Sequence, residues 1–585
     1  MTSLERLEAD NLYAVVDMGS NGIRFSISNL SPPTTRIMPI LFQDRVGISL
    51  YDAQFPATSD GQRAPIPTSV IEDVVTRLLK FKTTCEDFNV PAQNIHVLAT
   101  EATRTALNSA EFLGTIKSKT GWKVKLLSKE DEGRIGALGV ASSFSSVQGL
   151  VMDLGGGSTQ LTWMIAKDGT VETSSRGSIS FPYGAAALTR RLQIAQAKGQ
   201  KAVDELRAEV KANLQTAYPS LEVPESLEKT AKQQEGFDLY LSGGGFRGWG
   251  YLLMSQSRLN PYPIPIINGF RAMPRDFEDT SAVMSTAAES EDNKIFRVSK
   301  RRASQVPAVA LLVNVLRECL PSVRSIRFCQ GGVREGFLFD KLAPEIRSQD
   351  PLVVATKPYA TASADIIYDL LRKCLPNTIS SILSRQVPYS FSPSLLHGLS
   401  NLLFAHVAVP RETRPAAGLY STTTGILASA NSLAHSDRAI LALVLSERWP
   451  GDLAPAEESF KARLQQFLSP DEAWWCQYLG RVAALIGDVY PAGRLPQEAP
   501  RISFSTNWKE ISKKKQGTTD ALCLKVVLHQ SVQQTVTESS LRDTINDIEK
   551  CGKRKNWIKA DDRLLSTERV AGDYGISVEV ELLSD

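Results

Sequence analysis

The chain has few cysteines and histidines, no excess of charge of either sign, and no long apolar run. Its seven cysteines are dispersed and form no Cys-x-x-Cys pair, which favours free thiols in a reducing compartment over a disulfide framework or a zinc site. The formal net charge is +3, so bulk charge will not hold nucleic acid or a membrane. The apolar stretch 308–316 is far short of the roughly 20 residues that span a bilayer, and the first residues contain no signal-peptide core. These absences predict a soluble intracellular protein without nucleic acid or membrane as a partner.

Two segments share one strand–turn–strand plan. Residues 12–28 and 149–165 each contain an apolar strand that leads to an Asp, a turn of Gly and small polar residues, and a second strand. This pattern is typical of a β-hairpin. We interpret the pair as an internal repeat that forms two similar lobes, residues 1–148 and 149–345, with a ligand cleft between them. Chance similarity of two hairpins is the alternative.

Helical and strand patterns alternate through both lobes. Helical periodicity at 71–88 and 109–120 alternates with short apolar strands at 94–100 and 238–244, which indicates an α/β class. Residues 262–294 are predicted to be a long loop.

The C-terminal part of the chain changes character twice. Apolar periodicity predicts a helical domain at 350–497. After a proline-bearing linker, strands that flank a helix predict a small α/β domain at 500–585. With 585 residues and roughly 150 residues per domain, about four domains are expected. The predicted fold class is therefore α/β, with a duplicated two-lobed part, a helical domain and a small C-terminal α/β domain.

Glycine-rich turns follow three of the predicted strands. Three consecutive glycines, 155–157, let the backbone approach a ligand that side chains would exclude, and their N–H groups with the hydroxyls of 158–159 suit phosphate oxygens. The turn at 19–22, followed by Arg24, is a second donor-rich site. The third turn, 243–245, either admits a nucleotide or begins a helix. Ordinary hairpin turns are the alternative for the first two, and no Walker pattern occurs.

Charged residues offer two further candidates. Acids at 130–132 fall in the first turn of a predicted helix, where they complement the helix dipole; a catalytic role for one of them is the alternative. Arg104 is either a phosphate clamp or a surface charge.

Six motifs occur in order between residues 12 and 345: VVDMGSNGIRF, ATEATRTALN, LSKEDEGRIGALGV, VMDLGGGSTQL, LSGGGFRG and FCQGGVREGFLFDKL. In this order they resemble the Ppx/GppA family of exopolyphosphatases and guanosine pentaphosphate phosphohydrolases. The resemblance implies the actin-like fold of sugar kinases and heat-shock ATPases, followed by a helical domain similar to HD phosphohydrolases. The length and the two additional domains most resemble the fungal retrograde-signalling regulators of this family, which implies a cytoplasmic protein that relays mitochondrial dysfunction to nuclear transcription.

The resemblance also implies roles for individual residues. The family's general base corresponds to Glu132, and Asp17 and Asp153 would hold a Mg²⁺ ion. The ligand would be polyphosphate, a guanosine polyphosphate or an ATP-like nucleotide. The implied phosphate- or nucleotide-binding residues are Asp17, Gly19, Ser20, Asn21, Arg24, Arg104, Asp153, Gly155, Gly156, Gly157, Ser158, Thr159, Gln160, Gly243, Gly244 and Gly245.

Three positions depart from the family pattern. Gln160 replaces a carboxylate with an amide, Gly22 removes a hydroxyl donor, and Lys129 adds a cation. We therefore expect ligand binding to be better preserved than catalysis. The leading hypothesis is a regulator whose lobes close around the ligand and present a surface to a signalling protein partner; an active Mg²⁺-dependent phosphohydrolase is the alternative, and a scaffold with a vestigial cleft is the third.

Histidines and basic residues of the C-terminal part are two further candidates for binding sites. The segment His435-Ser436-Asp437 is not the His-Asp doublet of HD hydrolases, so no metal is expected there, and His397 and His406 are interpreted as packing residues. The lysines at 513–515 and the basic residues at 550–555 are interpreted as solvated surface. A polyphosphate groove in a homodimer is the alternative.

Overall fold

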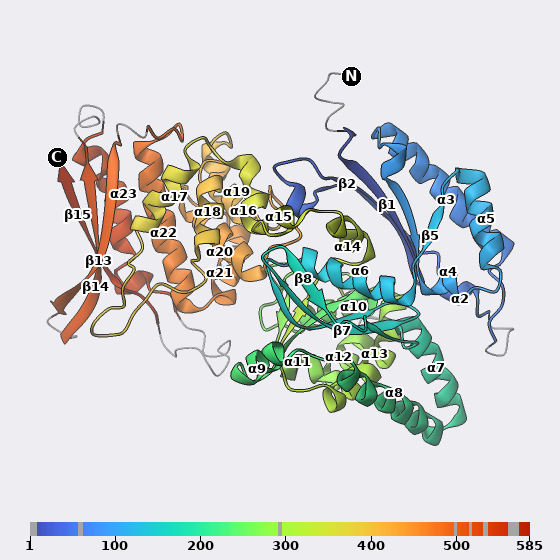
Figure 1. The fold of residues 1–585 in the computed structure, drawn as a ribbon. Coiled ribbons are helices and arrows are strands. Elements are labelled where there is room, and N and C mark those ends of the chain that lie inside the picture. The colour runs from blue at the N-terminus through green and yellow to red at the C-terminus, as the bar shows by residue number, and fades with distance from the viewer. Residues whose placement is uncertain are drawn as a thin grey trace. The chain divides into compact units, whose positions relative to one another are not determined.

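The computed structural model describes residues 9–56, 62–289, 295–496, 500–513, 517–529, 536–559 and 573–584, which form two compact units (Figure 1). Unit 1 comprises the described residues of Met1–Ser257, Ile266–Pro351 and Asn431–Leu433, and unit 2 those of Arg258–Pro265, Leu352–Ala430 and Ala434–Asp585. The predicted boundaries between lobes and domains stay predictions.

The first sheet of unit 1 contains the first predicted hairpin. Its strand order is β3 (Ile40–Val46), β2 (Gly22–Asn29), β1 (Leu12–Gly19), β4 (Ile95–Ala99) and β5 (Val124–Leu126). Because β1 and β2 pair antiparallel up to Gly19 opposite Gly22, only Ser20 and Asn21 form the turn, and Asp17 lies opposite Arg24. The associated helices are α2 (Leu50–Ala53), α3 (Thr68–Asp87), α4 (Glu101–Arg104) and α5 (Ser109–Thr120). One apolar core joins α3 and α5 to the sheet.

The second sheet contains the second hairpin, as the repeat predicts. Its order is β11 (Arg271–Ala272), β12 (Val323–Phe328), β10 (Phe237–Ser242), β6 (Val147–Leu154), β7 (Thr159–Lys167) and β8 (Thr170–Thr173), with β9 (Ile179–Phe181) also on β7. Asp153 lies opposite Gln160 in the β6–β7 ladder, as Asp17 lies opposite Arg24 in the first hairpin. The helices that follow are α7 (Ala185–Lys198), α8 (Gln200–Ser220), α9 (Glu225–Gln233), α10 (Gly243–Ser255), α11 (Pro274–Glu278), α12 (Thr280–Glu289) and α13 (Lys300–Cys319).

The prediction of a long loop at 262–294 was wrong for part of that segment. It contains β11, α11 and α12, while 290–294 lie outside the described residues. The sequence of α12, TSAVMSTAAE, is rich in small residues and shows little apolar periodicity, although Val283 and Ala287 are buried. Tertiary contact, rather than the local pattern, therefore accounts for this helix.

Two helices pack between the sheets of unit 1 (Figure 1). They are α6 (Lys129–Ser142) and α14 (Val333–Asp340), which α15 (Pro344–Arg347) follows. Side chains of both helices share a core with Val15 of the first sheet and Val151 of the second. A Cβ at Gly139 would overlap the backbone of Gly332, so glycine is required where α6 meets the start of α14. This packing sets Glu132, in the first turn of α6, in front of both hairpin turns.

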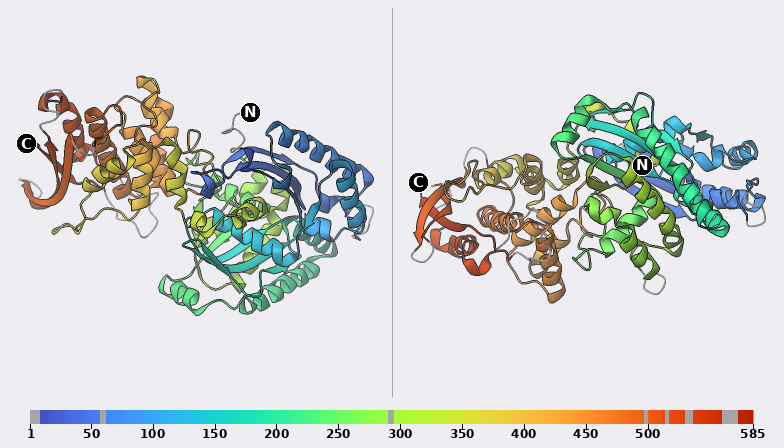
Figure 2. Two further views of the ribbon diagram at one scale, coloured as in Figure 1. Left: turned by 45° about the horizontal axis from the view of Figure 1, so that its top comes forward. Right: turned by 90° about the horizontal axis from the view of Figure 1, so that it is seen from below.

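Unit 2 contains helices and a small mixed sheet, as predicted. The helices are α17 (Ala364–Lys373), α18 (Pro393–Leu402), α19 (Arg414–Tyr420), α20 (His435–Glu447), α21 (Pro455–Phe467) and α22 (Pro470–Val489), and α16 (Pro351–Thr356) precedes them. The sheet has the order β13 (Ile502–Lys513), β14 (Gly517–Leu528) and β15 (Ser577–Ser584), with α23 (Glu538–Lys550) between β14 and β15 in the chain. The helices lie against one face of this sheet (Figure 2). The fold class predicted from the sequence is thus confirmed.

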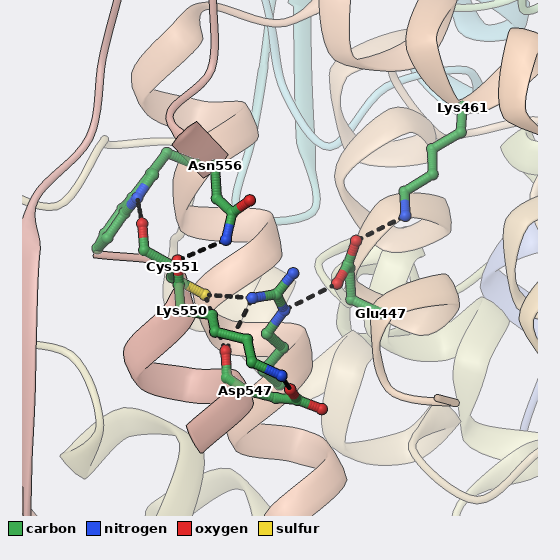
Figure 3. Close-up of polar contacts among 8 residues, drawn as sticks. Glu447, Lys461, Asp547, Lys550, Cys551 and Asn556 are labelled. Atoms are coloured by element: carbon green, nitrogen blue, oxygen red, sulfur yellow. Dashed lines mark hydrogen bonds and ion pairs between the residues drawn. The ribbon is translucent and has the colours of Figure 1, made fainter. Parts of the chain in front are cut away.

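A largely buried ion network joins α20, α21, α22 and α23 (Figure 3), in which the side chains of Glu447, Lys461 and Arg481 are 14–21% exposed. Glu447 accepts hydrogen bonds from Lys461 Nζ at 2.6 Å and from Arg481 Nε at 3.2 Å. Arg481 Nη1 donates to the carbonyl of Asp547 at 2.8 Å and to Cys551 Sγ at 3.3 Å. Although burial alone would raise it, the two cations hold the pKa of Glu447 below its ordinary value. The network therefore locks the helices together, since removing one partner would leave a buried charge unpaired.

The histidines singled out in the sequence make packing contacts. His435 Nδ1 lies 2.8 Å from the Tyr262 hydroxyl, the His397 ring stacks on Tyr368 with centroids 3.8 Å apart, and burial lowers the pKa of His406. Within the described part of the chain, no group of three or more His, Cys, Asp or Glu side chains is arranged to hold a metal ion. In the same residues, no helix combines the length and the apolar character needed to cross a bilayer. Lys514 and Lys515 lie outside the described residues.

Candidate functional site

A pocket in unit 1 lies between the turns of the two hairpins and has a volume of about 990 Å³, part of which is open to solvent. The first sheet contributes the β1–β2 turn, and the second contributes the β6–β7 turn and the start of α10. The lining residues that the sequence predicted as site residues are Asp17, Gly19, Ser20, Asn21, Arg24, Glu132, Asp153, Gly155, Gly156, Ser158, Gly243 and Gly244. The structure thus brings together residues that are more than 200 positions apart in the sequence.

The predicted general base lies at the wall of this pocket. The hydroxyl of Ser128 caps α6 by accepting the N–H of Asp131 at 3.0 Å, so the first turn of α6 is held firmly. One turn contains Glu130, which is fully exposed, and Glu132, whose side chain is 12% exposed. Glu132 accepts a hydrogen bond from Arg104 Nη1 at 3.1 Å. Burial nevertheless raises the pKa of Glu132 to about 7, since it outweighs the lowering effect of Arg104. The nearby carboxylates of Asp153 and Asp17 raise the pKa further.

The hairpin aspartates differ in their surroundings. Asp17 is buried, and burial raises its pKa while the guanidinium of Arg24 lowers it in part. Asp153 Oδ2 accepts a hydrogen bond from Ser242 Oγ at 2.5 Å. Mg²⁺ in phosphate-binding proteins takes one or two carboxylates and completes its shell with waters and phosphate oxygens. Asp17 and Asp153 both line the pocket, so they could hold such an ion together with oxygens that a ligand supplies.

The β6–β7 turn presents donors rather than acceptors. The carbonyls of Gly155, Gly156 and Gly157 accept hydrogen bonds from N–H groups at 184–187, around the first turn of α7, at 2.9 to 3.2 Å. The N–H of Gly155 donates to the carbonyl of Ser158 at 3.0 Å, so among the described residues of the turn the N–H groups of Gly156 and Gly157 remain for an anion. A Cβ at Gly156 would lie 2.6 Å from Asn21 Cγ, so the two hairpin turns touch where glycine removes the side chain.

Five predicted site residues lie behind the pocket lining rather than on it: Arg104, Gly157, Thr159, Gln160 and Gly245. Thr159 Oγ1 donates to the carbonyl of Tyr183 at 3.0 Å, and Gln160 Nε2 donates to Ser158 Oγ at 2.8 Å. Arg104 reaches the pocket through Glu132, and its Nε and Nη2 are buried without a hydrogen-bond partner among the described residues. Their ligand roles stay predictions.

Glycines 243–245 begin α10 and also approach the pocket. Gly243 has φ +89, a conformation that favours glycine, and it lines the pocket with Gly244. Gly245 instead packs on Leu154, whose side chain a Cβ would overlap. The helix-start alternative is confirmed, and this helix start is also a wall of the pocket. That the turn admits a nucleotide stays a prediction. Lys129, by contrast, is exposed and does not line it.

Sequence reasoning missed a group of arginines that line the pocket beside Arg24. They are Arg45, Arg247, Arg301 and Arg302, from β3, α10 and α13. Burial lowers the pKa of Arg247 to about 9, and burial followed by repulsion from neighbouring arginines lowers the pKa of Arg45 to about 10. Like charges held this close are typical of a site that receives an anion. The run Lys300-Arg301-Arg302 at the start of a helix was the signal that could have revealed part of the group.

Comparison with known proteins agrees with the motif resemblance. Residues 30–345 match the model of the Ppx/GppA phosphatase family, and residues 350–583 match that of the RTG2 C-terminal domain. The chain is 38% identical over 570 residues to Retrograde regulation protein 2 of Saccharomyces cerevisiae, which covers 92% of this chain and 94% of the relative. It is 28% identical over 255 residues to Exopolyphosphatase 1 of Mycobacterium leprae, covering 42% of this chain and 68% of the relative. A solved Ppx/GppA enzyme of Aquifex aeolicus matches 56% of this chain and 99% of its own, with 22% identity and a TM-score of 0.42.

Proposed function

Starting from the fact that the chain belongs to the Ppx/GppA phosphatase family, we propose that it is a cytoplasmic regulator of signalling from mitochondria to the nucleus. In this proposal the pocket of unit 1 binds a phosphate-chain or nucleotide ligand, namely polyphosphate, a guanosine polyphosphate or an ATP-like molecule. The regulatory role is supported by the similarity to Retrograde regulation protein 2, which extends through both matched segments of the chain.

One observation carries the ligand class: arginines from β2, β3, α10 and α13 converge on a pocket whose glycine turn presents N–H donors. Guanidinium groups form short, charge-assisted hydrogen bonds with phosphate oxygens. A multiply charged phosphate would relieve the repulsion among these arginines. Binding would favour one arrangement of the surrounding elements over another, and a signalling partner that contacts only one arrangement would read ligand occupancy.

Titration calorimetry with sodium tripolyphosphate, ATP and guanosine pentaphosphate, each with and without Mg²⁺, tests this proposal. Arg24→Gln and Arg247→Gln should weaken binding by about tenfold or more each, because a charge-assisted hydrogen bond contributes roughly 1.5–3 kcal/mol. Arg176→Gln is the matched control, since it removes the same charge from Arg176, which forms an exposed ion pair with Glu222. If the wild-type protein binds none of these ligands, the pocket is not a phosphate site and the proposal fails.

A second function is favoured by the position of Glu132. A general base is most effective when its pKa lies near the working pH, and the pKa of Glu132 is about 7. In an active phosphohydrolase Glu132 would accept a proton from water as the water attacks the terminal phosphorus and the bridging P–O bond breaks, while Arg24 offsets charge on the phosphoryl oxygens. Mg²⁺ held by Asp17 and Asp153 would neutralise phosphate charge.

Phosphate release from long-chain polyphosphate and guanosine pentaphosphate separates the two functions. Mg²⁺-dependent release by the wild type that is lost in Glu132→Ala would establish hydrolysis. If both proteins are folded and bind the ligand, but the wild type releases phosphate no faster than Glu132→Ala, then the protein is a regulator without enzyme activity on these substrates.

A further inference from the structure

Arg301 connects the two hairpin-bearing halves of unit 1 through a single nitrogen. It lies in the first turn of α13, and its Nη2 lies 2.8 Å from three acceptors of the first sheet region, which share its two hydrogens: Asn21 Oδ1, Ser49 Oγ and Asp52 Oδ2. Helix α13 packs against α7, α8 and α10, which accompany the second sheet. One guanidinium group therefore holds together the β1–β2 turn, the start of α2, and a helix from the other side of the pocket.

The contact with Asn21 matters because an amide has two unlike ends. Its oxygen only accepts hydrogen bonds, and its nitrogen only donates them. An amide oxygen turned toward a phosphate would repel it, whereas the nitrogen would donate to it. Because Arg301 binds Oδ1, the acceptor end of Asn21 is occupied and the NH₂ group is free to point elsewhere. The Asn21 amide also lies directly over Gly156 of the second turn, where a Cβ added to Gly156 would lie 2.7 Å from Asn21 Nδ2.

The neighbouring turn residue is held in a similar way. The carbonyl of Ser20 accepts hydrogen bonds from the N–H of Tyr51 at 3.0 Å and from Ser49 Oγ at 3.2 Å. Ser49 also caps α2 by accepting the N–H of Asp52. Since Ser49 and Asp52 are both bound by Arg301, the guanidinium group supports the turn from two directions. The carboxylate of Asp52 already balances its charge, so general attraction of anions is a smaller part of its role than it is for the other pocket arginines.

We propose that Arg301 is a positioning residue for the phosphate ligand, which it serves by fixing the Asn21 amide with its NH₂ group toward the bound anion. The inference rests on the proposed function, because it requires that a phosphate occupy this pocket. It assigns Arg301 a task different from that of Arg24 or Arg247: it acts through Asn21 and need not touch the ligand.

A double-mutant cycle with sodium tripolyphosphate as the probe tests this assignment. Residues that act through one another give non-additive effects, whereas independent residues add. We expect Arg301→Gln to weaken binding by about tenfold in the wild-type background but by less than about threefold when Asn21 is already alanine. Arg176→Gln should bind as the wild type does.

The outcomes separate the two levels of the argument. If the wild type does not bind tripolyphosphate, the proposed function fails and the inference fails with it. If the wild type binds but Arg301→Gln weakens binding equally in both backgrounds, then Arg301 acts independently of Asn21 and only the inference is overturned.

Hydrogen exchange of the free protein, measured on the same variants, distinguishes local loosening of the turn from a general loss of folding. Exchange should accelerate in residues 49–54 of Arg301→Gln, where Tyr51 donates to the Ser20 carbonyl, and should stay unchanged in α6. Unchanged exchange in both segments would show that Arg301 does not hold the turn, which also overturns the inference.

Discussion

Replacing Glu132 with glutamine should stabilise the protein at alkaline pH but much less at acid pH. Burial raises the pKa of this carboxyl from 4.5 to about 7. Between these values the folded protein retains a proton that the unfolded chain releases, so the stability present at low pH is lost as the pH rises from about 4.5 to about 7. Above that range the ionised carboxylate is a burden on the folded state, and glutamine removes it while its amide oxygen can still accept from Arg104.

The size of the effect follows from the shift. A difference of about 2.5 pKa units at 1.36 kcal/mol each corresponds to about 3.4 kcal/mol at full ionisation. At pH 5 the folded carboxyl is already protonated and the unfolded one is partly ionised, which leaves about 0.8 kcal/mol. The change in the free energy of unfolding caused by Glu132→Gln should therefore be about 2–3 kcal/mol more favourable at pH 8 than at pH 5.

Urea unfolding of the wild type and Glu132→Gln at pH 5 and pH 8, at one ionic strength, measures this difference. Glu130→Gln is the matched control, because Glu130 lies in the same helical turn but is fully exposed, and hydrogen bonds lower its pKa. That variant should be slightly destabilising at pH 8 instead. An equal effect of Glu132→Gln at both pH values would refute the raised pKa, and with it the argument that Glu132 is suited to act as a base near neutral pH.

Three further predictions concern other parts of the chain. In Gln160→Glu the side chain can no longer donate to Ser158 Oγ and adds an acid near the pocket, so calorimetry without Mg²⁺ should show about tenfold weaker tripolyphosphate binding, and unchanged affinity would contradict the importance of this amide. Gly139→Ala should destabilise unit 1 by about 2–4 kcal/mol in urea unfolding, because its Cβ would overlap the backbone at the start of α14. The control Gly136→Ala, on the same helix with open space around it, should be neutral or stabilise by up to about 1 kcal/mol. Similar effects of the two substitutions would refute the close packing. Glu447→Gln should destabilise unit 2 by about 2–3 kcal/mol at pH 7, since it leaves two largely buried cations without their anion. Because the pKa of this carboxyl is depressed, the loss should shrink as the pH falls through that pKa, and a loss that does not depend on pH would count against the ion network.

Local patterns in the sequence predicted the two hairpins well, and also helix α6, which lies between them in the chain. Asp17 and Asp153 occupy equivalent ladder positions opposite Arg24 and Gln160, as the repeat indicated. A hairpin turn depends on a few adjacent backbone conformations, which glycine and small polar residues set directly. The cap by Ser128 and the acids of the first helical turn are equally local. Helix α12 escaped prediction because its small side chains are buried against the neighbouring helices α10 and α13, and not by a pattern of its own.

The family, the two donor-rich turns and the acids that face them could be identified from the sequence, since each is contained in a short run of residues. Which of these residues meet depends on the packing of the folded chain. It placed Thr159 and Gln160 outside the pocket lining, where Thr159 Oγ1 donates to the Tyr183 carbonyl and Gln160 Nε2 donates to Ser158 Oγ. It also brought Arg301 from α13 to Asn21 in the first hairpin turn, a contact between residues 280 positions apart. Contacts over such separations depend on how helices and sheets pack, and no periodicity within one segment encodes them.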